Sequence, residues 1–276
     1  MPRSRSTNVP ILTRKLSKSA MEFLSRPEHT QARFSRGSYF CLKDGTRLQG
    51  VTTLIEKLFV PTHVEVRGSN SCVRLDQVES VKMARQACRA KGTTHGSCID
   101  YELQEYVRDP DKFNSNKHRK DQCTLAILRD LKKKRWRILS SQLIIYCATL
   151  RIGTAIDLLC VDEFGELVLL EVKCTQYLDY YHHVQWDARK KRLATFARPL
   201  QDVNYSVYNS HQLQLFLMKL IMSYQYGVRD MRVFLCQVNP AYPPIFHPLE
   251  KWVEKHSRPI FNYLLAHANV NKASFK

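Results

Sequence analysis

The sequence predicts an α/β fold with a mixed central sheet flanked by helices. Two apolar runs, at residues 155–161 and 167–172, are joined by a turn-like Asp-Glu-Phe-Gly segment, which is typical of a hairpin of buried strands. Helical periodicity precedes and follows this hairpin. The expected order is helix (97–107), strand (141–149), strand (153–161), strand (166–174), helix (209–226) and strand (231–238). This αβββαβ order predicts one core with extensions at both ends.

The charge of the chain indicates its class of partner. The 276 residues include 43 Lys and Arg against 25 Asp and Glu, which gives a formal net charge of +18. Such a surface attracts polyanions, so nucleic acid is the expected partner, and a generally basic protein without one is the alternative. No apolar run approaches the ~20 residues that cross a bilayer, which excludes an integral membrane protein.

The nine cysteines do not form a recognisable framework. Their number is odd, no two form a C-x-x-C pair, and several lie within apolar strand sequence. This pattern favours reduced core thiols in an intracellular protein over a disulfide scaffold or a zinc ribbon.

The first 77 residues are expected to lie outside the core. Residues 1–35 are expected to form a basic flexible arm or a targeting segment, because residues 1–21 carry five Lys or Arg and no acidic residue. Residues 36–77 are expected to form an accessory element. Within it, a Lys-Asp-Gly turn at Gly45 separates two short apolar stretches, and a helical pattern follows, which predicts a small hairpin and a helix.

The core is expected over residues 78–240, and its first helices carry a candidate ligand. Apolar residues recur at helical spacing, with a break at residues 91–96, where Thr93 or Thr94 can cap a second helix. His95 and Glu102 are seven residues apart and so project from the same side of that helix. For His95, the alternative is an ordinary hydrogen-bonded histidine at a helix start.

Two basic insertions are expected to interrupt the core, at residues 112–137 and 175–205. The first ends in the run Lys132, Lys133, Lys134, Arg135, Trp136 and Arg137, which is either a solvated helix face, a phosphate-binding surface or a nuclear import signal. The second places aromatic residues before the run Arg189, Lys190, Lys191 and Arg192, which suits either base stacking beside phosphate contacts or packing on the fold.

The remaining segments are expected to be mostly helical. Residues 209–226 predict an amphipathic helix capped near Asn209 or Ser210. Residues 241–276 are expected to form a helical extension, with a last helix over residues 252–268 that is interrupted near Pro259.

Three charged residues interrupt the apolar hairpin: Asp157, Glu171 and Lys173. Side chains alternate along a strand, so Glu171 and Lys173 share a face, and folding the hairpin brings Asp157 within about one residue of register with Glu171. Buried charges cost several kcal/mol each unless they are paired or bind a metal. The cluster is therefore either a metal site or a buried ion-pair triad in an inactive fold.

Carboxylates beside a lysine suit phosphodiester hydrolysis. That reaction needs an activated water and neutralisation of the leaving oxygen, and Mg2+ or Mn2+ held by carboxylates supplies both. Asp157 and Glu171 are the expected metal ligands, and the backbone carbonyl of Val172 can add an oxygen. Lys173 can orient the water or stabilise charge in the transition state. His95 would add a nitrogen ligand, which favours Mn2+.

The pattern Gly-Thr-Ala-Ile-Asp ending at Asp157, followed by Glu171-Val172-Lys173, resembles the PD-(D/E)xK nuclease superfamily, whose restriction-endonuclease-like core has the order described above. Ile156 replaces the proline of the founding motif. A Gly-Thr-Thr-His motif ending at His95, and Gln212 followed by Phe216 in place of Tyr, resemble the RecB-like exonuclease branch, to which viral alkaline and YqaJ-like and mitochondrial DNA exonucleases are similar.

The resemblance, over roughly residues 80–240, implies a metal-dependent exodeoxyribonuclease that acts on DNA ends or single-stranded DNA in replication, recombination or repair. It also implies a positioning role for Gln212. No iron-sulfur cluster is expected, because only Cys236 follows Gln212. A structure-selective endonuclease and an inactive nucleic-acid-binding protein are the alternatives. The run from Lys132 to Arg137 favours a nuclear location, and the acid-poor amino terminus permits a mitochondrial one.

Overall fold

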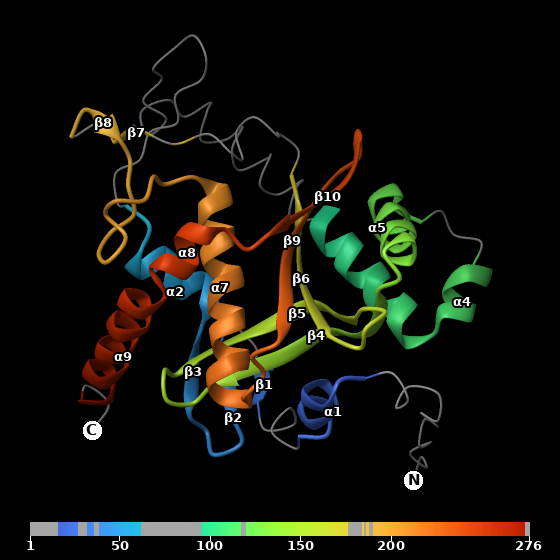
Figure 1. Cartoon of the computed structure of the whole chain (residues 1–276), viewed down its shortest axis with the longest axis horizontal. Coiled ribbons are helices and arrows are strands. Elements are labelled where there is room, and N and C mark those ends of the chain that lie inside the picture. The colour runs from blue at the N-terminus through green and yellow to red at the C-terminus, as the bar shows by residue number, and fades with distance from the viewer. Residues whose placement is uncertain are drawn as a thin grey trace.

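A computed structural model describes residues 16–26, 32–35, 39–61, 95–116, 120–175, 184, 186–187 and 190–273, and its centre is an eight-stranded mixed sheet (Figure 1). The order is β1-β2-β3-β5-β6-β9-β10, and β4 also pairs with β5. The pairs β3–β5 and β6–β9 are parallel, and the others are antiparallel. The strands are β1 (Ala32–Ser35), β2 (Tyr39–Leu42), β3 (Arg47–Gly50), β4 (Arg137–Cys147), β5 (Ile152–Val161), β6 (Leu167–Cys174), β9 (Met231–Asn239) and β10 (Tyr242–Pro248); β7 (Trp186–Asp187) and β8 (Arg192–Leu193) form a separate ribbon.

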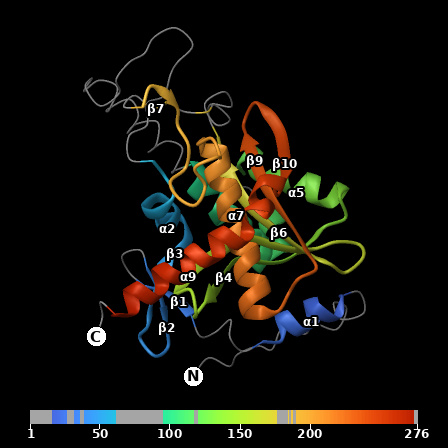
Figure 2. The same ribbon diagram turned by 60° about the vertical axis from the view of Figure 1, so that its left-hand side comes forward.

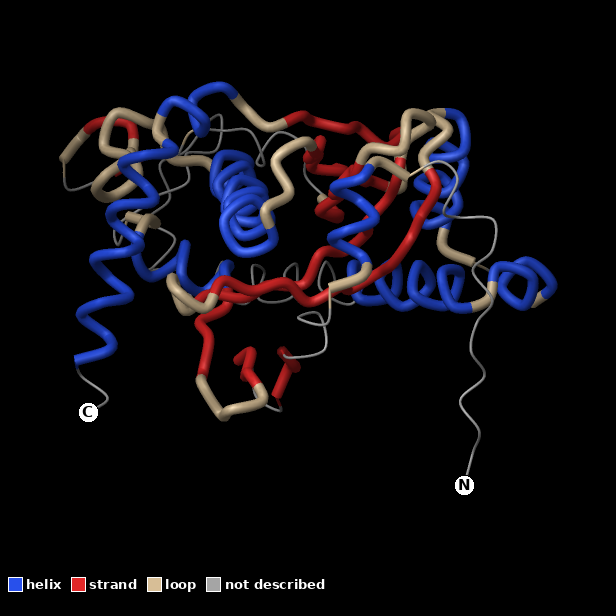
Figure 3. The backbone as a smooth tube through the Cα atoms, turned by 60° about the horizontal axis from the view of Figure 1, so that its bottom comes forward, coloured by secondary structure: helices blue, strands red, loops and turns tan. Residues whose placement is uncertain are grey.

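Helices cover both faces of the sheet, which confirms the predicted α/β class. The helices are α1 (Lys18–Leu24), α2 (Val51–Leu58), an unlabelled helix over residues 95–108, α4 (Pro110–Ser115), α5 (Gln122–Lys133), α7 (Val207–Tyr226), α8 (Lys251–Lys255) and α9 (Ser257–Ala273). Figure 1 shows α2, α7, α8 and α9 on one side of the sheet and α5 on the other, and Figure 2 shows α9 crossing α7. Figure 3 shows strands running between two groups of helices.

Each face of the sheet buries its own apolar cluster. The larger cluster packs α7 and α2 against β4, β5 and β6 through residues such as Leu169 and Leu217. The smaller cluster packs helix 95–108 and α5 on the opposite face, through Ile99, Ile127 and Leu170. Because Leu169 and Leu170 alternate between the two clusters, β6 is buried on both sides, and its continuous apolar sequence follows from that burial.

The central hairpin follows the prediction closely. The turn is closed by a hydrogen bond from the amide of Asp162 to the carbonyl of Glu166, and Gly165 adopts a φ of 87°, which favours glycine. Leu158 pairs with Leu170, so continuing this register by one residue sets Asp157 opposite Glu171. The predicted convergence of the two carboxylates is therefore present.

The amino-terminal hairpin, β2–β3, and the helix α2 are also present as expected. Gly45, with a φ of 84°, lies in the turn of this hairpin. Parallel pairing of Gln49 with Ile152 joins the hairpin to β5, so it extends the main sheet. A Cβ on Gly153 would lie 3.2 Å from the Phe40 ring, so this junction favours glycine.

Part of the expected flexible arm is folded. Ser17 caps α1 by accepting a hydrogen bond from the amide of Ala20, and Phe23 packs edge-on against Tyr226 with ring centroids 5.3 Å apart. Residues 1–15, the turn motif at 92–94, the aromatic residues and histidines at 177–183, and Arg189 lie outside the described residues.

Five local expectations were wrong. The strand β4 begins at Arg137, four residues early, and α7 is capped by Ser206, whose hydroxyl accepts from the amide of Asn209. The α7 helix is buried on most sides and is not amphipathic, because the sheet and α2 both pack on it.

The C-terminal segment also differs from the expected helical extension. Residues 242–248 form a strand, β10, paired with β9. The helix break lies at His256, since Pro259 occupies the first turn of α9, where its missing N–H costs nothing.

Candidate active site

Glu171 is the centre of a buried polar cluster. Its side chain on β6 is 3% exposed, and its Oε1 accepts hydrogen bonds from Lys173 Nζ, at 2.6 Å, and from Gln214 Nε2 on α7. Its Oε2 is buried and has no hydrogen-bond partner among the described residues. Buried carboxylate oxygens are normally paired, so an unpaired one is a feature that a cation would explain.

Asp157 faces the same space from β5. Its Oδ1 accepts from Gln142 Nε2 at 3.0 Å, and its Oδ2 accepts from the Val172 amide at 2.8 Å. Gln142 lies between the β4 residues that pair with Leu158 and Ile156 of β5. Its φ of 51° interrupts the regular pairing of β4 with β5 at this position. An ionised carboxylate has about four lone-pair sites, so both oxygens of Asp157 can still bind a cation.

A third carboxylate, Asp100, approaches from helix 95–108. The pKa of Asp100 is raised to about 6: burial is the largest cause, the charge of Asp157 acts in the same direction, and the charge of Lys173 opposes them. These interactions place Asp100 within electrostatic range of both residues. Asp100 was not predicted from the sequence, because its approach to Asp157 depends on how helix 95–108 packs on the sheet, and a polar residue beside the buried Ile99 is ordinary on such a helix.

The charges in the site depend on one another. Burial raises the pKa of Glu171 to about 7, and the nearby charge of Asp157 acts in the same direction. Burial also raises the pKa of Asp157. For Lys173, burial favours the neutral amine, but Glu171, Asp157 and Asp100 outweigh it and raise the pKa of Lys173. The site therefore has an excess of carboxylate over ammonium, which favours a bound cation.

The helix α7 contributes Gln214, whereas Gln212 was predicted. Gln212 is buried away from Glu171, where its amide donates to the Tyr208 hydroxyl and the Pro248 carbonyl and accepts from the amide of Glu250. Residues two apart on a helix point in different directions, so only one of the two glutamines can reach β6. His211 also faces the site: burial and the charge of Lys173 hold its pKa well below the ordinary value.

His95 lies in a neighbouring group and does not bond to Asp157 or Glu171. Its Nε2 is 2.7 Å from Asp121 Oδ2, and its Nδ1 is 3.2 Å from Cys174 Sγ. His95, Asp121 and Cys123 bring ligand atoms within 4.8 Å of one another, so this group also has the composition of a divalent metal site. The carboxylate of Glu102 accepts from the amide of Asp121, which ties the helix to the start of α5.

The run from Lys132 to Arg137 lies far from Lys173. Arg137 pairs with Val161 and Val161 with Leu167, so the run lies at the turn end of the hairpin, six residues of β6 or roughly 20 Å from Lys173. Its side chains are partly engaged: Arg135 pairs with Glu163 at 2.8 Å, and Lys134 lies over the Phe246 ring. Trp136 is partly buried and packs against Phe234 and Phe246 at the edge of the smaller apolar cluster.

The second basic run lies beside a cavity of about 410 Å3. Lys190 and Arg192 line it with Lys57 and Arg198, and all four are exposed. Asp187 is the one acidic residue that lines the cavity in the described part of the chain, and it pairs with Lys190 at 3.8 Å. Lys191 is exposed but does not line the cavity.

Comparison with known proteins gives a limited result. No protein-family profile matches the chain, and no curated protein matches it. Among solved structures, the chain is similar to the crystal structure of a "Putative exonuclease" from Eubacterium rectale at 2.19 Å resolution. The two share 13% identity over 64% of this chain and 67% of the other, with a TM-score of 0.34. In the described residues, no helix combines the length and apolar character needed to cross a bilayer.

Proposed function

We propose that this chain is a divalent-metal-dependent deoxyribonuclease, an exonuclease that acts on DNA ends or single strands. The observation that carries the proposal is the buried Glu171 carboxylate, which has one oxygen held by Lys173 and Gln214 and the other unpaired, opposite Asp157. In a structural ion pair, both oxygens of a buried carboxylate would normally have hydrogen-bond partners. A metal site instead needs a carboxylate oxygen that is available to bind the ion.

The residues present fit Mg2+ or Mn2+, because the atoms that they can offer to an ion are oxygens. Asp157, Glu171 and Asp100 would hold the ion, with the Val172 carbonyl as the further oxygen ligand that the sequence suggested. Bound there, the ion supplies an activated water and neutralises charge on the leaving oxygen.

The surrounding side chains fix this arrangement. Gln214 and Lys173 hold one oxygen of Glu171, while Gln142 and the Val172 amide hold Asp157. The Lys173 side chain is 26% exposed, so it lies at the boundary between the buried site and solvent. It can orient the attacking water and stabilise negative charge in the transition state.

The choice of nucleic acid as substrate rests on charge, and the choice of DNA over RNA rests on the resemblance of the sequence motifs. The net charge of +18 and the exposed cations around the cavity beside β8 provide attraction for a phosphate backbone. Acting on an end or a single strand is the expectation that the sequence motifs raised.

The test uses end-labelled linear duplex, linear single-stranded and circular single-stranded DNA with Mg2+, Mn2+ or EDTA. We expect linear DNA to be degraded only with a metal, and Asp157→Asn and Lys173→Ala each to lose at least about 100-fold in rate, as is typical for charged groups at such centres. Asp111→Asn, an exposed residue in the first turn of α4, is the matched control and should retain full activity.

Two results would count against the proposal. Degradation that persists in EDTA would exclude metal dependence, and full activity in both Asp157→Asn and Lys173→Ala would exclude this site. Cleavage of the circular strand would replace exonuclease with endonuclease.

A further inference from the structure

A second cluster of ligand-type side chains lies on the opposite face of β6 from Glu171. His95 begins the described part of helix 95–108, Asp121 is the N-cap of α5, and Cys123 lies in the first turn of α5. One imidazole nitrogen, one carboxylate oxygen and one sulfur lie within 4.8 Å of one another. Ligands around a tetrahedral Zn2+ are separated by roughly 3.3–3.8 Å, so small side-chain movements would complete a site.

We propose that His95, Asp121 and Cys123 form a zinc site that is separate from the nuclease centre. The donor set decides the metal: a thiolate and an imidazole favour Zn2+, whereas Mg2+ prefers oxygen ligands only. The charges of one thiolate and one carboxylate balance the charge of the ion. Binding releases the Cys123 thiol proton. The ion takes the place of the proton between His95 Nε2 and Asp121 Oδ2, and in the neutral imidazole that proton moves to Nδ1.

The atoms around the three ligands are arranged to hold them. With Nε2 on the metal, the imidazole carries its proton on Nδ1, where the Cys174 sulfur lies 3.2 Å away as an acceptor. The other oxygen of Asp121 is fixed by the Cys123 amide at 2.8 Å. The Asp121 amide donates to both oxygens of Glu102 at 3.0 Å. Each ligand except the Cys123 sulfur is therefore oriented by a hydrogen bond.

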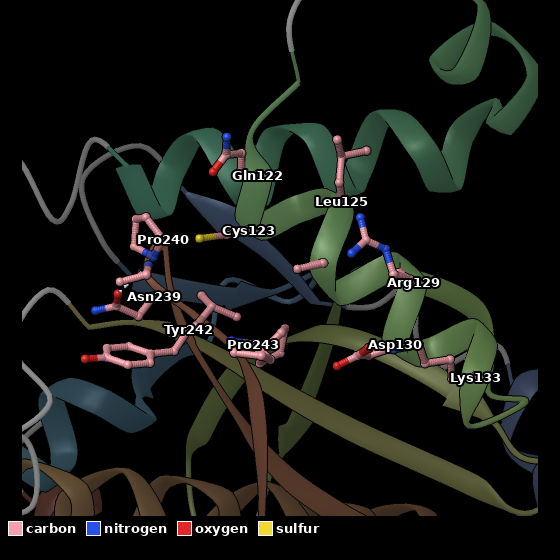
Figure 4. Close-up of a pocket in the computed structure, with 14 residues that line it drawn as sticks. Gln122, Cys123, Leu125, Arg129, Asp130, Lys133, Asn239, Pro240, Tyr242 and Pro243 are labelled. Atoms are coloured by element: carbon pink, nitrogen blue, oxygen red, sulfur yellow. Dashed lines mark hydrogen bonds and ion pairs between the residues drawn. The ribbon is translucent and has the colours of Figure 1, made fainter.

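The site also has a route to solvent. Cys123 lines a cavity of about 460 Å3 between α5 and the β9–β10 hairpin. Figure 4 shows its sulfur pointing into this space between Gln122 and Pro240, with Asn239 and Tyr242 nearby. An ion can enter from this side, and a water from the cavity can fill the fourth coordination position.

Zinc here would join two helices next to the nuclease centre. The ligands come from helix 95–108, which carries Asp100, and from α5, and Cys174 follows Lys173 directly. Zinc would therefore fix the helix that presents Asp100 without touching the reacting groups.

The test measures zinc and not nuclease activity. The full chain is expressed with added zinc, dialysed, and analysed for metal content. We expect about one zinc per chain, and near-complete loss in His95→Gln and in Cys123→Ser. Cys160→Ser, a buried thiol of the same apolar cluster outside the triad, should keep its zinc. Asp157→Asn should keep it too, which separates this inference from the proposed nuclease function.

A cobalt experiment gives a readout that needs no variant. Co2+ bound by the wild-type chain should show a thiolate charge-transfer band and the intense visible absorption of tetrahedral cobalt. Absence of zinc and of the cobalt bands from the wild type would overturn the site. So would unchanged zinc in folded His95→Gln and Cys123→Ser, judged by circular dichroism.

Discussion

At the scale of single residues, two glutamines of α7 have different surroundings. Gln214 donates to Glu171 in the candidate active site, whereas Gln212 joins Tyr208 to the segment that leads into α8. Both are buried, with 4% and 0% exposure, so burial does not distinguish them. Their hydrogen-bond partners distinguish them. A glutamine that orients a metal ligand affects the reaction, whereas a glutamine that bonds to backbone groups affects the stability of the fold.

We predict opposite effects for Gln214→Ala and Gln212→Ala. The first should lower the nuclease rate about 10- to 100-fold, the range seen when a partner of a metal ligand is removed, with a small change in stability. The second should lower stability by about 1–3 kcal/mol, because the Glu250 amide loses its acceptor, and should leave the rate of the folded fraction unchanged. Rate assays and urea unfolding of both variants test this. Equal rate losses would contradict it.

The raised pKa of Glu171 predicts a pH-dependent stability. Its folded pKa of about 7 lies above its ordinary value of 4.5, so the folded state binds a proton more tightly than the unfolded chain. The resulting stabilisation is complete below pH 4.5 and is lost as pH rises to about 7. In EDTA, we therefore expect the wild type to lose about 2 kcal/mol more than Glu171→Gln between pH 5 and 8.

Denaturant unfolding at several pH values measures this difference. The variant serves as the control for titrating groups away from the site, because its amide resembles the protonated carboxyl. A divalent ion should restore stability in the wild type more at pH 8 than at pH 5, since it replaces the proton. Parallel pH profiles for the two proteins would contradict the prediction.

At the scale of elements, α7 shows what sequence patterns leave open. Its existence and length were predictable from a long apolar segment, but its start was not, because Ser206, Asn209 and Ser210 are all good capping residues. Only the turn geometry selects Ser206, whose φ of −142° is extended and whose hydroxyl accepts from Asn209. Its buried, non-amphipathic character follows from α2 and α9 packing over it, which local sequence does not encode.

We predict that Ser206→Ala destabilises the protein by about 1 kcal/mol, since an unmade cap leaves an amide of the first turn without a partner. Ser210→Ala, within the helix, should change stability by less than 0.5 kcal/mol, as is usual for such substitutions. Thermal or urea unfolding compares the two. A larger loss from Ser210→Ala would show that the cap lies where the sequence first suggested.

The hairpin was the most predictable element, and the environment of its charges was the least. Alternation and turn chemistry are local, so the strands β5 and β6 and the opposition of Asp157 and Glu171 could be derived from the sequence. The contributions of Asp100 and Gln142 could not, because they come from elements whose packing depends on the whole fold. Gln142 reaches Asp157 through a left-handed backbone conformation in β4, which is rare for a residue with a side chain.

At the scale of the whole molecule, the two basic runs have different settings. The run that includes Lys133 and Arg135 lies roughly 20 Å from Lys173, and both of these residues pair with acidic neighbours. Lys190 and Arg192 face a cavity with two further cations, Lys57 and Arg198. Lys190 pairs with Asp187, but Arg192 and Arg198 form no ion pair with a described residue. Cations outside ion pairs release more counterions on binding DNA than cations already in ion pairs.

We therefore predict that Arg192→Ala and Arg198→Ala together weaken DNA binding more than Lys133→Ala and Arg135→Ala together. Each lost phosphate contact should reduce the slope of log affinity against log salt by about 0.7–0.9. Fluorescence anisotropy with an oligonucleotide at several salt concentrations measures that slope. An equal or larger effect from the second pair would assign DNA binding to the turn end of the hairpin.

The strand β10 has a consequence for the solution behaviour of the protein. It ends the sheet, and no other described strand pairs with its outer side, where backbone groups would be open to other chains. Pro243, Pro244 and Pro248 have no N–H to donate, and the register with β9 shifts between Tyr242 and Ile245. This edge is consequently a poor template for strand addition, and the protein's resistance to intermolecular β-aggregation would depend on those prolines as well as on the repulsion between highly charged copies.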